Sequence, residues 1–232
     1  MTDQLKQRPV DASVATTKAN RINARSRRTA SKAVRREQLI EATIESISRY
    51  GISGTTMNTV TGFAGLSVGI VNFHFKNKET LYQETLRFLG EEHRDLWKGD
   101  LEKAGDDLSN QLLAIVDSHF HPNLCSRNKL TVWFAFYGEA GYRQRYRALM
   151  QEIDAERWDI LRNLCSKMIS QGGYSDLNVE SVIKTLEVMF DGFWLNMLIY
   201  PNQFHPDDGK RQIRDFLALK LPEHFSATNP HV

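Results

Sequence analysis

Residues 56–81 read TMNTVTGFAGLSVGIVNFHFKNKETL, and they carry the clearest structural pattern in the chain. It predicts two short helices, over about 57–64 and 68–74, with a tight glycine-containing turn between them. Thr55 and Thr56 are available to cap the first amide groups of the first helix, and Ser67 stands where it can cap the second. Two short helices joined in this way are typical of a helix-turn-helix unit.

The remainder of the chain predicts further helices. Ile40, Ile44 and Ile47 share one helix face, so a helix is expected to begin near Lys32 and to stop at Gly51. Beyond the quoted stretch, periodic apolar residues predict six more helices, over about 78–99, 107–120, 125–137, 142–171, 178–200 and 206–220. Because no stretch alternates as a strand does, the sequence predicts an all-α fold.

Charge divides the chain into a basic head and an acidic body, although the net charge is only +2. Residues 1–78 carry thirteen Lys and Arg against five Asp and Glu, a balance of +8. Residues 79–232 carry seventeen against twenty-three, a balance of −6. A head of this kind indicates an anionic partner, either nucleic acid or a membrane surface, and the helix-turn-helix spacing favours DNA.

The second short helix has the residues of a DNA-reading helix. Its small start, with Ser67 and Gly69, lets backbone amides approach the duplex, whose major groove is ~12 Å wide. Asn72 can pair with a base edge, most naturally adenine, and Phe73 can contact a thymine methyl group. Contacts to phosphate position such a helix without specifying sequence. The candidate DNA-binding residues are Thr56, Ser67, Val68, Gly69, Asn72, Phe73, His74 and Lys78, the last two as phosphate contacts.

This head resembles the DNA-binding unit of TetR-family repressors. The Ala-Gly-Leu-Ser turn at 64–67, the His-Phe pair at 74–75 and the Lys-Glu-x-Leu start at 78–81 match in order and spacing. With the upstream helix, the resemblance covers about 32–82. It implies a homodimeric repressor that binds a palindromic operator and responds to a small effector. Asn72 stands where the family usually has Tyr, so the base preference there does not carry over.

Two aromatic clusters mark the acidic body. They are Trp133-Phe134-Ala135-Phe136-Tyr137 and Asp191-Gly192-Phe193-Trp194-Leu195. Aromatic faces and a nearby carboxylate hold a quaternary ammonium ion, which has no N–H to donate. The candidate effector-binding residues are Trp133, Phe136, Tyr137, Asp191 and Trp194. The alternative is that they are core aromatics with an ion-paired aspartate, an alternative that is strongest for Phe136.

The same clusters are similar to those of one branch of the TetR family, the choline-responsive repressors of glycine betaine synthesis. Including the head, this resemblance covers roughly 32–222 and implies choline as the effector. Another lipophilic cation, or an unrelated small molecule, is the alternative effector.

We therefore expect four segments along the chain. They are a disordered basic arm (1–31), a helix-turn-helix domain (32–77, motif about 56–75), a helical ligand-binding and dimerisation domain (78–222) and a tail (223–232). The arm either contacts DNA phosphate or is a solvated tail without a partner. The expected dimer seam is formed by the last two helices, whose apolar residues include Phe190, Phe193, Met197, Phe216 and Leu217.

Other classes of function are disfavoured by what the sequence lacks. There is no apolar run long enough to span a membrane and no secretory leader, and two cysteines fit a reducing compartment, so we expect a cytoplasmic protein. No phosphate-binding glycine loop or nucleophile elbow is present, so no enzyme activity and no cofactor are expected. His119, His121 and Cys125 have metal-like spacing without a fourth ligand. We interpret them as a helix-end loop with solvated histidines, and expect no metal.

Overall fold

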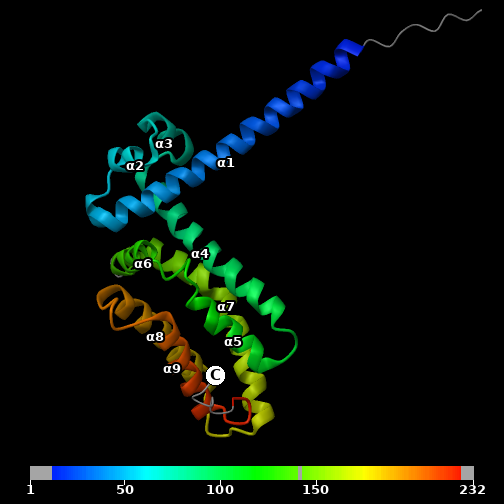
Figure 1. The fold of residues 1–232 in the computed structure, drawn as a ribbon, viewed down its shortest axis with the longest axis vertical. Helices are drawn as coiled ribbons and strands as arrows, with labels where there is room; N and C mark the ends of the chain where they lie inside the picture. Colours follow the sequence, from blue (N-terminus) through cyan, green and yellow to red (C-terminus); the bar gives the residue numbers. More distant parts are fainter. Residues whose placement is uncertain (1–11, 141–142, 226–232) are drawn as a thin grey trace, which may run out of the picture.

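The computed structural model describes residues 12–140 and 143–225, with side chains from Lys32 onward (Figure 1). Within that part of the chain it contains helices and no strands, which confirms the all-α prediction. No helix described there is long and apolar enough to cross a membrane. The helices are α1 (Ala12–Gly54), α2 (Met57–Ala64), α3 (Val68–Phe75), α4 (Lys78–Lys103), α5 (Leu108–His119), α6 (Arg127–Ala140), α7 (Gln144–Gly172), α8 (Val179–Ile199) and α9 (Pro206–Lys220).

Helices α1, α2 and α3 form the head, in which α2 packs against α1, and α3 packs against α2 and the start of α4 (Figure 1). Of the two threonines expected as caps of α2, Thr56 serves: its hydroxyl accepts a hydrogen bond from the Thr59 amide at 3.1 Å. Ser67 stands at the start of α3 as expected, but its side chain makes no capping hydrogen bond, contrary to the prediction. Gly65 ends α2 in the left-handed region, at φ 62°, a conformation that other residues rarely adopt. This turn aims α3 away from α2 and leaves one side of α3 uncovered.

The first helix begins earlier than the sequence analysis expected. The structure places residues 12–31 in α1, whereas we expected them to belong to a disordered arm. This segment has few apolar residues with which to pack against the core. A low apolar content does not, however, prevent the segment from forming a helix. The segment between Ala12 and the kink at Gly51 has no glycine or proline to interrupt it. Residues 1–11 of the expected arm lie outside the described residues.

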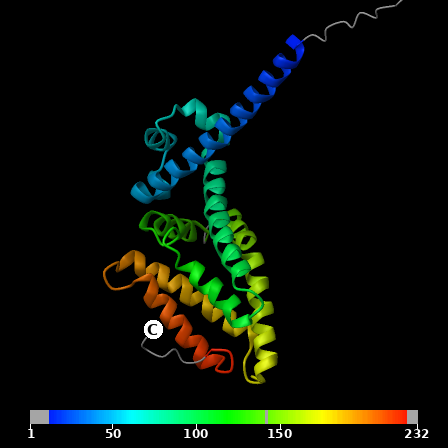
Figure 2. The same cartoon turned by 45° about the vertical axis from the view of Figure 1, so that its right-hand side comes forward.

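Helix α4 connects the head to the body. Its first turn follows α3, it packs against α1 near the head, and its later turns contact α5 and α7 (Figures 1 and 2). Asn77 caps it by accepting a hydrogen bond from the Thr80 amide at 2.8 Å. Leu81, Leu86 and Leu89 are fully buried, so one apolar core continues from the head into the body. A displacement of α4 in the body would therefore move the head.

The apolar residues expected at the dimer seam lie mostly inside the protomer. Phe190, Phe193, Met197 and Leu217 are buried, and Phe216 is half-buried. Periodicity identifies an apolar helix face but does not show whether the core or a second subunit covers it, and here the core does. A different stripe is exposed on the last two helices. It consists of Val188, Leu195 and Ile199 on α8 and Leu219 on α9.

Candidate functional site

The uncovered side of α3 carries most of the expected DNA-binding residues. Phe73 is 71% exposed and Val68 37% exposed, although both are apolar. Thr56, Ser67, Gly69 and Asn72 are exposed beside them. Val71 and Phe75, on the opposite side of α3, are buried. Helix α3 is therefore anchored in the core of the head by its buried side, and its other side exposes small, polar and apolar side chains.

The expected phosphate contacts stand at the edge of this face. Lys78 is half-buried, with its ammonium group 5.2 Å from the Tyr82 ring centre. Lys32 of α1 places its ammonium group 5.4 Å from the centre of the Phe73 ring, which brings a further positive charge beside α3. Burial, and then Lys32 and Arg36, lower the pKa of His74, so this imidazole is neutral at physiological pH.

The body contains a small cavity where α4, α5, α6, α7 and α8 meet. We call it the aromatic cavity. The residues that line it are His93, His119, Trp133, Tyr137, Asp154, Arg157, Glu187, Phe190, Asp191 and Trp194. Four of the five expected effector-binding residues are among them, so the structure brings together two clusters that are 54 residues or more apart in the chain.

Aromatic rings form most of the wall of the aromatic cavity. The ring centres of Trp133 and Trp194 are 6.2 Å apart, and the His119 ring is stacked on Phe190 at 3.8 Å. The Trp194 indole donates a hydrogen bond to the His119 carbonyl oxygen at 2.8 Å, which fixes the ring between α8 and the end of α5. This arrangement gathers aromatic rings around one small volume, and recognition of an organic cation requires such rings.

The polar part of the aromatic cavity carries an excess of negative charge. Three carboxylates, those of Asp154, Glu187 and Asp191, face the Arg157 guanidinium. Arg157 is buried and donates hydrogen bonds to Glu187 and, at 3.0 Å, to Asp154. Asp191 stands at the exposed mouth, where it accepts a hydrogen bond from the Tyr137 hydroxyl at 3.3 Å. With Arg157 already shared, an added cation would be attracted to the remaining charge.

Burial sets the protonation of the groups around the aromatic cavity. Desolvation of its carboxyl group, with Glu187 beside it, raises the pKa of Asp191 to about 6. Burial, and then Arg157, lowers the pKa of His93 to about 3, so its imidazole is neutral. Burial also lowers the pKa of His119, and His93 adds to that effect. The two histidines therefore contribute no positive charge to oppose a cation.

The aromatic cavity is tightly closed in this structure. Its free space for water-sized molecules is about 20 Å³, which is room for about one water molecule. An organic cation is larger than this. Binding therefore requires that side chains move, and Tyr137 and Asp191 at the mouth are joined by a long hydrogen bond that can open.

Two sequence interpretations are corrected by the structure. Phe136 does not line the aromatic cavity: its ring is fully buried against Tyr82 and Tyr146, with ring centres at 6.1 and 5.4 Å. His119 is not a solvated helix-end residue, because it is buried with its Nδ1 at 2.8 Å from the Ile115 carbonyl oxygen. Within the described residues, no group of His, Cys, Asp and Glu side chains is arranged to hold a metal ion.

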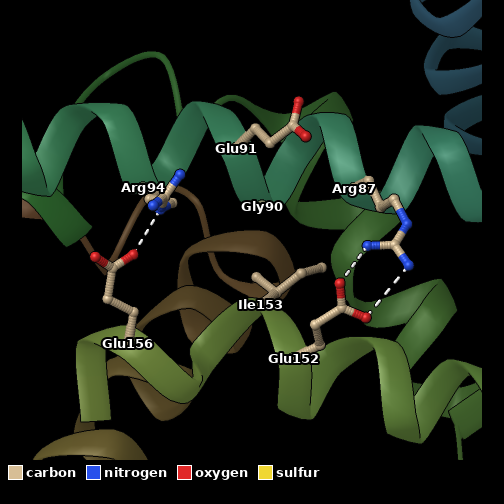
Figure 3. Close-up of a pocket in the computed structure, with 7 residues that line it drawn as sticks. All are labelled: Arg87, Gly90, Glu91, Arg94, Glu152, Ile153 and Glu156. Atoms are coloured by element: carbon tan, nitrogen blue, oxygen red, sulfur yellow. Dashed lines mark hydrogen bonds and ion pairs between the residues drawn. The ribbon is translucent and has the colours of Figure 1, made fainter. Parts of the chain in front are cut away.

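A close contact between α4 and α7 lies beside the aromatic cavity. Ile153 of α7 points at Gly90 of α4, and an ion pair stands on either side of it (Figure 3). The first is a bidentate ion pair, in which the guanidinium nitrogens of Arg87 lie 2.6 and 3.3 Å from the carboxylate oxygens of Glu152. The second joins Arg94 to Glu156 at 2.6 Å. A Cβ atom on residue 90 would lie only 2.6 Å from Ile153, so the two helices can approach this closely only at a glycine.

The Gly90→Ala variant should therefore be less stable than the wild type by ~1–3 kcal/mol, because the added methyl group overpacks the contact. The matched control is Gly99→Ala on the same helix, where an added Cβ meets nothing within 4 Å. That control should be neutral or gain up to ~1 kcal/mol from helix propensity. Urea unfolding measures both. Equal stability of the two variants would contradict the contact.

Comparison with known proteins identifies the family. Residues 39–85 match "Bacterial regulatory proteins, tetR family", and residues 109–222 match "BetI-type transcriptional repressor, C-terminal". The HTH-type transcriptional regulator BetI of Stenotrophomonas maltophilia (strain R551-3) is 30% identical over 188 residues, which cover 81% of this chain and 93% of that protein. This chain belongs to the TetR family. It is a TetR-type transcriptional regulator with a BetI-type C-terminal domain.

A further relative and two solved structures are also similar to this chain. BetI of Paraburkholderia phymatum is also 30% identical, over 82% of this chain and 94% of that protein. A structure described as a transcriptional regulator from Pseudomonas aeruginosa PAO1 has a TM-score of 0.72 at 25% identity, covering 82% of this chain and 91% of that one. A regulator structure from Saccharomonospora viridis in complex with choline has a TM-score of 0.69 at 20% identity, covering 78% and 94%. The last of these shows the shared fold.

Several residues of the aromatic cavity in this TetR-family regulator were not identified from the sequence. They are His93, Asp154, Arg157, Glu187 and Phe190, together with His119 in its buried role. Arg157 is one of many charged residues on α7, and its spacing does not distinguish it from the exposed ones. The sequence did carry a signal that His93 is buried, because its spacing places it with Leu86, Leu89 and Trp97 on the apolar side of α4.

Proposed function

We propose that this protein is a transcriptional repressor whose affinity for operator DNA is controlled by choline or a closely related quaternary ammonium ion. One observation carries the proposal: the aromatic cavity combines π faces with three carboxylates and a single guanidinium. That combination favours a quaternary ammonium ion, which has no N–H to donate and therefore needs no hydrogen-bond acceptor from the protein. The naming of curated relatives as BetI, and the choline complex of the Saccharomonospora viridis regulator, support the same ligand class.

DNA binding is assigned to the exposed side of α3 and its basic edge. Asn72 and Phe73 are the base-contacting candidates, whereas Lys78 and the backbone at Ser67 and Gly69 are the phosphate-contacting ones. Two such heads in a dimer need a separation of about one turn of DNA, ~34 Å, which implies a palindromic operator. The helical extension at 12–31 carries arginines that we assign to nonspecific phosphate contact.

Lys78→Ala should weaken binding to every DNA sequence alike and reduce the slope of log affinity against log salt by ~1, because one phosphate contact is lost. Asn72→Ala should instead cost ~1–3 kcal/mol on the preferred operator only, because a base contact is lost. Fluorescence anisotropy with operator and scrambled duplexes, at several salt concentrations, separates the two. An unchanged salt slope in Lys78→Ala would remove Lys78 from the phosphate role.

The dimer interface is assigned to the exposed apolar stripe of Val188, Leu195, Ile199 and Leu219. The first three repeat along α8 at a spacing that keeps them on one helix face. Exposed apolar side chains in a line are expected where a second copy of the chain covers them. Three of the four residues of this stripe lie on α8, the helix that also supplies four residues to the aromatic cavity, so the effector and the partner subunit act on the same element.

The link between the aromatic cavity and the head runs through α7 and α4. Asp154 and Arg157 line the aromatic cavity, while Glu152, Ile153 and Glu156 of the same two turns contact α4. A cation that rearranges the partners of Arg157 would shift this part of α7. Because α7 and α4 are in close contact at Gly90, a shift of α7 must displace α4, and a displacement of α4 changes the orientation of α3. The effector acts by binding one orientation better than the other.

A gel-shift experiment with palindromic DNA, with and without choline, tests the proposal. We expect a shifted complex whose amount changes as choline is added, and no change with an equal concentration of sodium chloride. Anionic vesicles serve as the competing target, since a basic head also fits a membrane surface. Binding to vesicles in preference to DNA, or DNA binding that no quaternary ammonium ion alters, would overturn it.

A further inference from the structure

Two polar atoms in the wall of the aromatic cavity have no hydrogen-bond partner within the described residues. They are Nε1 of Trp133 and Nε2 of His93, and both atoms are buried. Trp133 is 4% and His93 5% exposed, so bulk solvent does not reach them. Buried polar groups are rarely left unpaired in folded proteins, since each costs stability. Two such groups on one cavity point to a ligand group that completes them.

The hydrogen-bonding chemistry of the two atoms restricts which ligand groups can bind them both. The Trp133 indole can only donate a hydrogen bond. His93 is neutral, because burial, and then Arg157, lower its pKa to about 3, so its Nε2 either donates or accepts according to the tautomer. A hydroxyl group accepts from the indole and then either donates to the imidazole or accepts from it with its second lone pair. A methyl group can do neither.

A carboxylate fits the same atoms poorly. Asp154, Glu187 and Asp191 already supply three carboxylates to the aromatic cavity, against the guanidinium of Arg157. A ligand with its own carboxylate would add a fourth in a volume with little water to screen the repulsion. The surplus negative charge therefore admits a cation and rejects a zwitterion of similar size.

We propose that the aromatic cavity selects a quaternary ammonium alcohol by its hydroxyl group, which binds between Trp133 Nε1 and His93 Nε2. This inference rests on the proposed function. It adds that the protein distinguishes between ligands of the same charge by their hydroxyl group. His93 belongs to α4, three residues from Gly90, so the hydroxyl contact also reaches the helix that leads to the head. The ammonium group is left to the π faces and carboxylates.

Calorimetric titration of the full chain tests this with three ligands: choline, propyltrimethylammonium, which has a methyl group in place of the hydroxyl, and glycine betaine, which has a carboxylate. For the wild type we expect choline to bind roughly tenfold or more tightly than propyltrimethylammonium, because the latter leaves both polar atoms unpaired. Glycine betaine should bind more weakly than either. The wild-type ratio needs no variant, so it stands even if a variant fails to fold.

The variants His93→Phe and Trp133→Phe should each reduce the ratio of choline to propyltrimethylammonium affinity at least threefold. Each keeps an aromatic ring; Trp133→Phe removes the indole nitrogen, and His93→Phe removes both imidazole nitrogens, Nε2 among them. Trp158→Phe, which removes an indole outside the aromatic cavity, is the matched control and should leave the ratio unchanged.

A wild-type ratio near one, or a ratio that neither variant changes, would overturn the role of the hydroxyl while the proposed cation site stands. Tight binding of glycine betaine would also overturn it. If neither cation binds the wild type, the proposed function itself fails, and this inference fails with it.

Discussion

Replacing Arg157 by methionine should lower the free energy of unfolding by ~3–5 kcal/mol near neutral pH, one of the largest losses expected from any single change in this chain. The guanidinium is buried and holds Glu187 and Asp154, with Asp191 nearby. Methionine fills a similar volume, so the cost comes mainly from three carboxylates left close together without a cation. Thermal and urea unfolding measure the loss.

The loss should depend on pH in a defined direction. The folded-state pKa of Asp191 is already raised to about 6 by burial and by Glu187, and removing Arg157 raises it further. The folded variant then binds protons more tightly than the unfolded chain, so its stability recovers as the pH falls below about 6. Arg162→Met, on the exposed side of α7, is the control and should leave stability nearly unchanged at every pH. A deficit that is equal for the two variants, or that grows in acid, would contradict the account.

Trp194→Ala should weaken choline binding about thirtyfold, because a desolvated cation–π contact of ~2 kcal/mol is lost. The same change should destabilise the fold by ~3–5 kcal/mol, because Trp194 is 4% exposed and part of the core. Melting temperature must therefore be measured beside calorimetry. Both operator affinity and the fold of the head should survive, since α1–α3 are not altered.

Trp194→Phe separates the two roles of this residue. It keeps a π face but loses the hydrogen bond from the indole to the His119 carbonyl oxygen, worth ~0.5–1.5 kcal/mol. We expect a smaller loss of choline affinity than in Trp194→Ala. If Trp194→Phe folds normally and Trp194→Ala, with its fold verified, binds choline as the wild type does, then the ammonium group is bound elsewhere.

The head was predictable from local sequence rules. The bounds of α2 agree with the prediction because its cap, its turn glycine and its length are all encoded within a dozen residues. The extension of α1 was not predicted, because a helix lying beyond the core need not show apolar periodicity. Side-chain roles in DNA contact stay predictions, since local rules give exposure but not the partner.

The aromatic cavity was only partly predictable, for geometric reasons. Residues at i+3 and i+4 from Trp133 both lie near its helix face, but they differ by about 100° around the axis. That difference turns Tyr137 toward the aromatic cavity and Phe136 toward Tyr82. The contributions of Arg157 and Glu187 depend on how α7 and α8 pack, which no spacing within one helix encodes.

The central claim is that the aromatic cavity binds a quaternary ammonium cation through its charge as well as its shape. Calorimetric titration of the wild type with choline and with 3,3-dimethylbutanol, an uncharged analogue of the same shape, tests this most directly at about pH 7.5 and about pH 5. Choline should bind at least about tenfold more tightly than the alcohol near neutral pH. Only choline should lose affinity in acid, because the pKa of Asp191 is raised to about 6 and protonation removes a counter-charge. Equal affinity for the two ligands, or choline binding that ignores pH across this range, would contradict it.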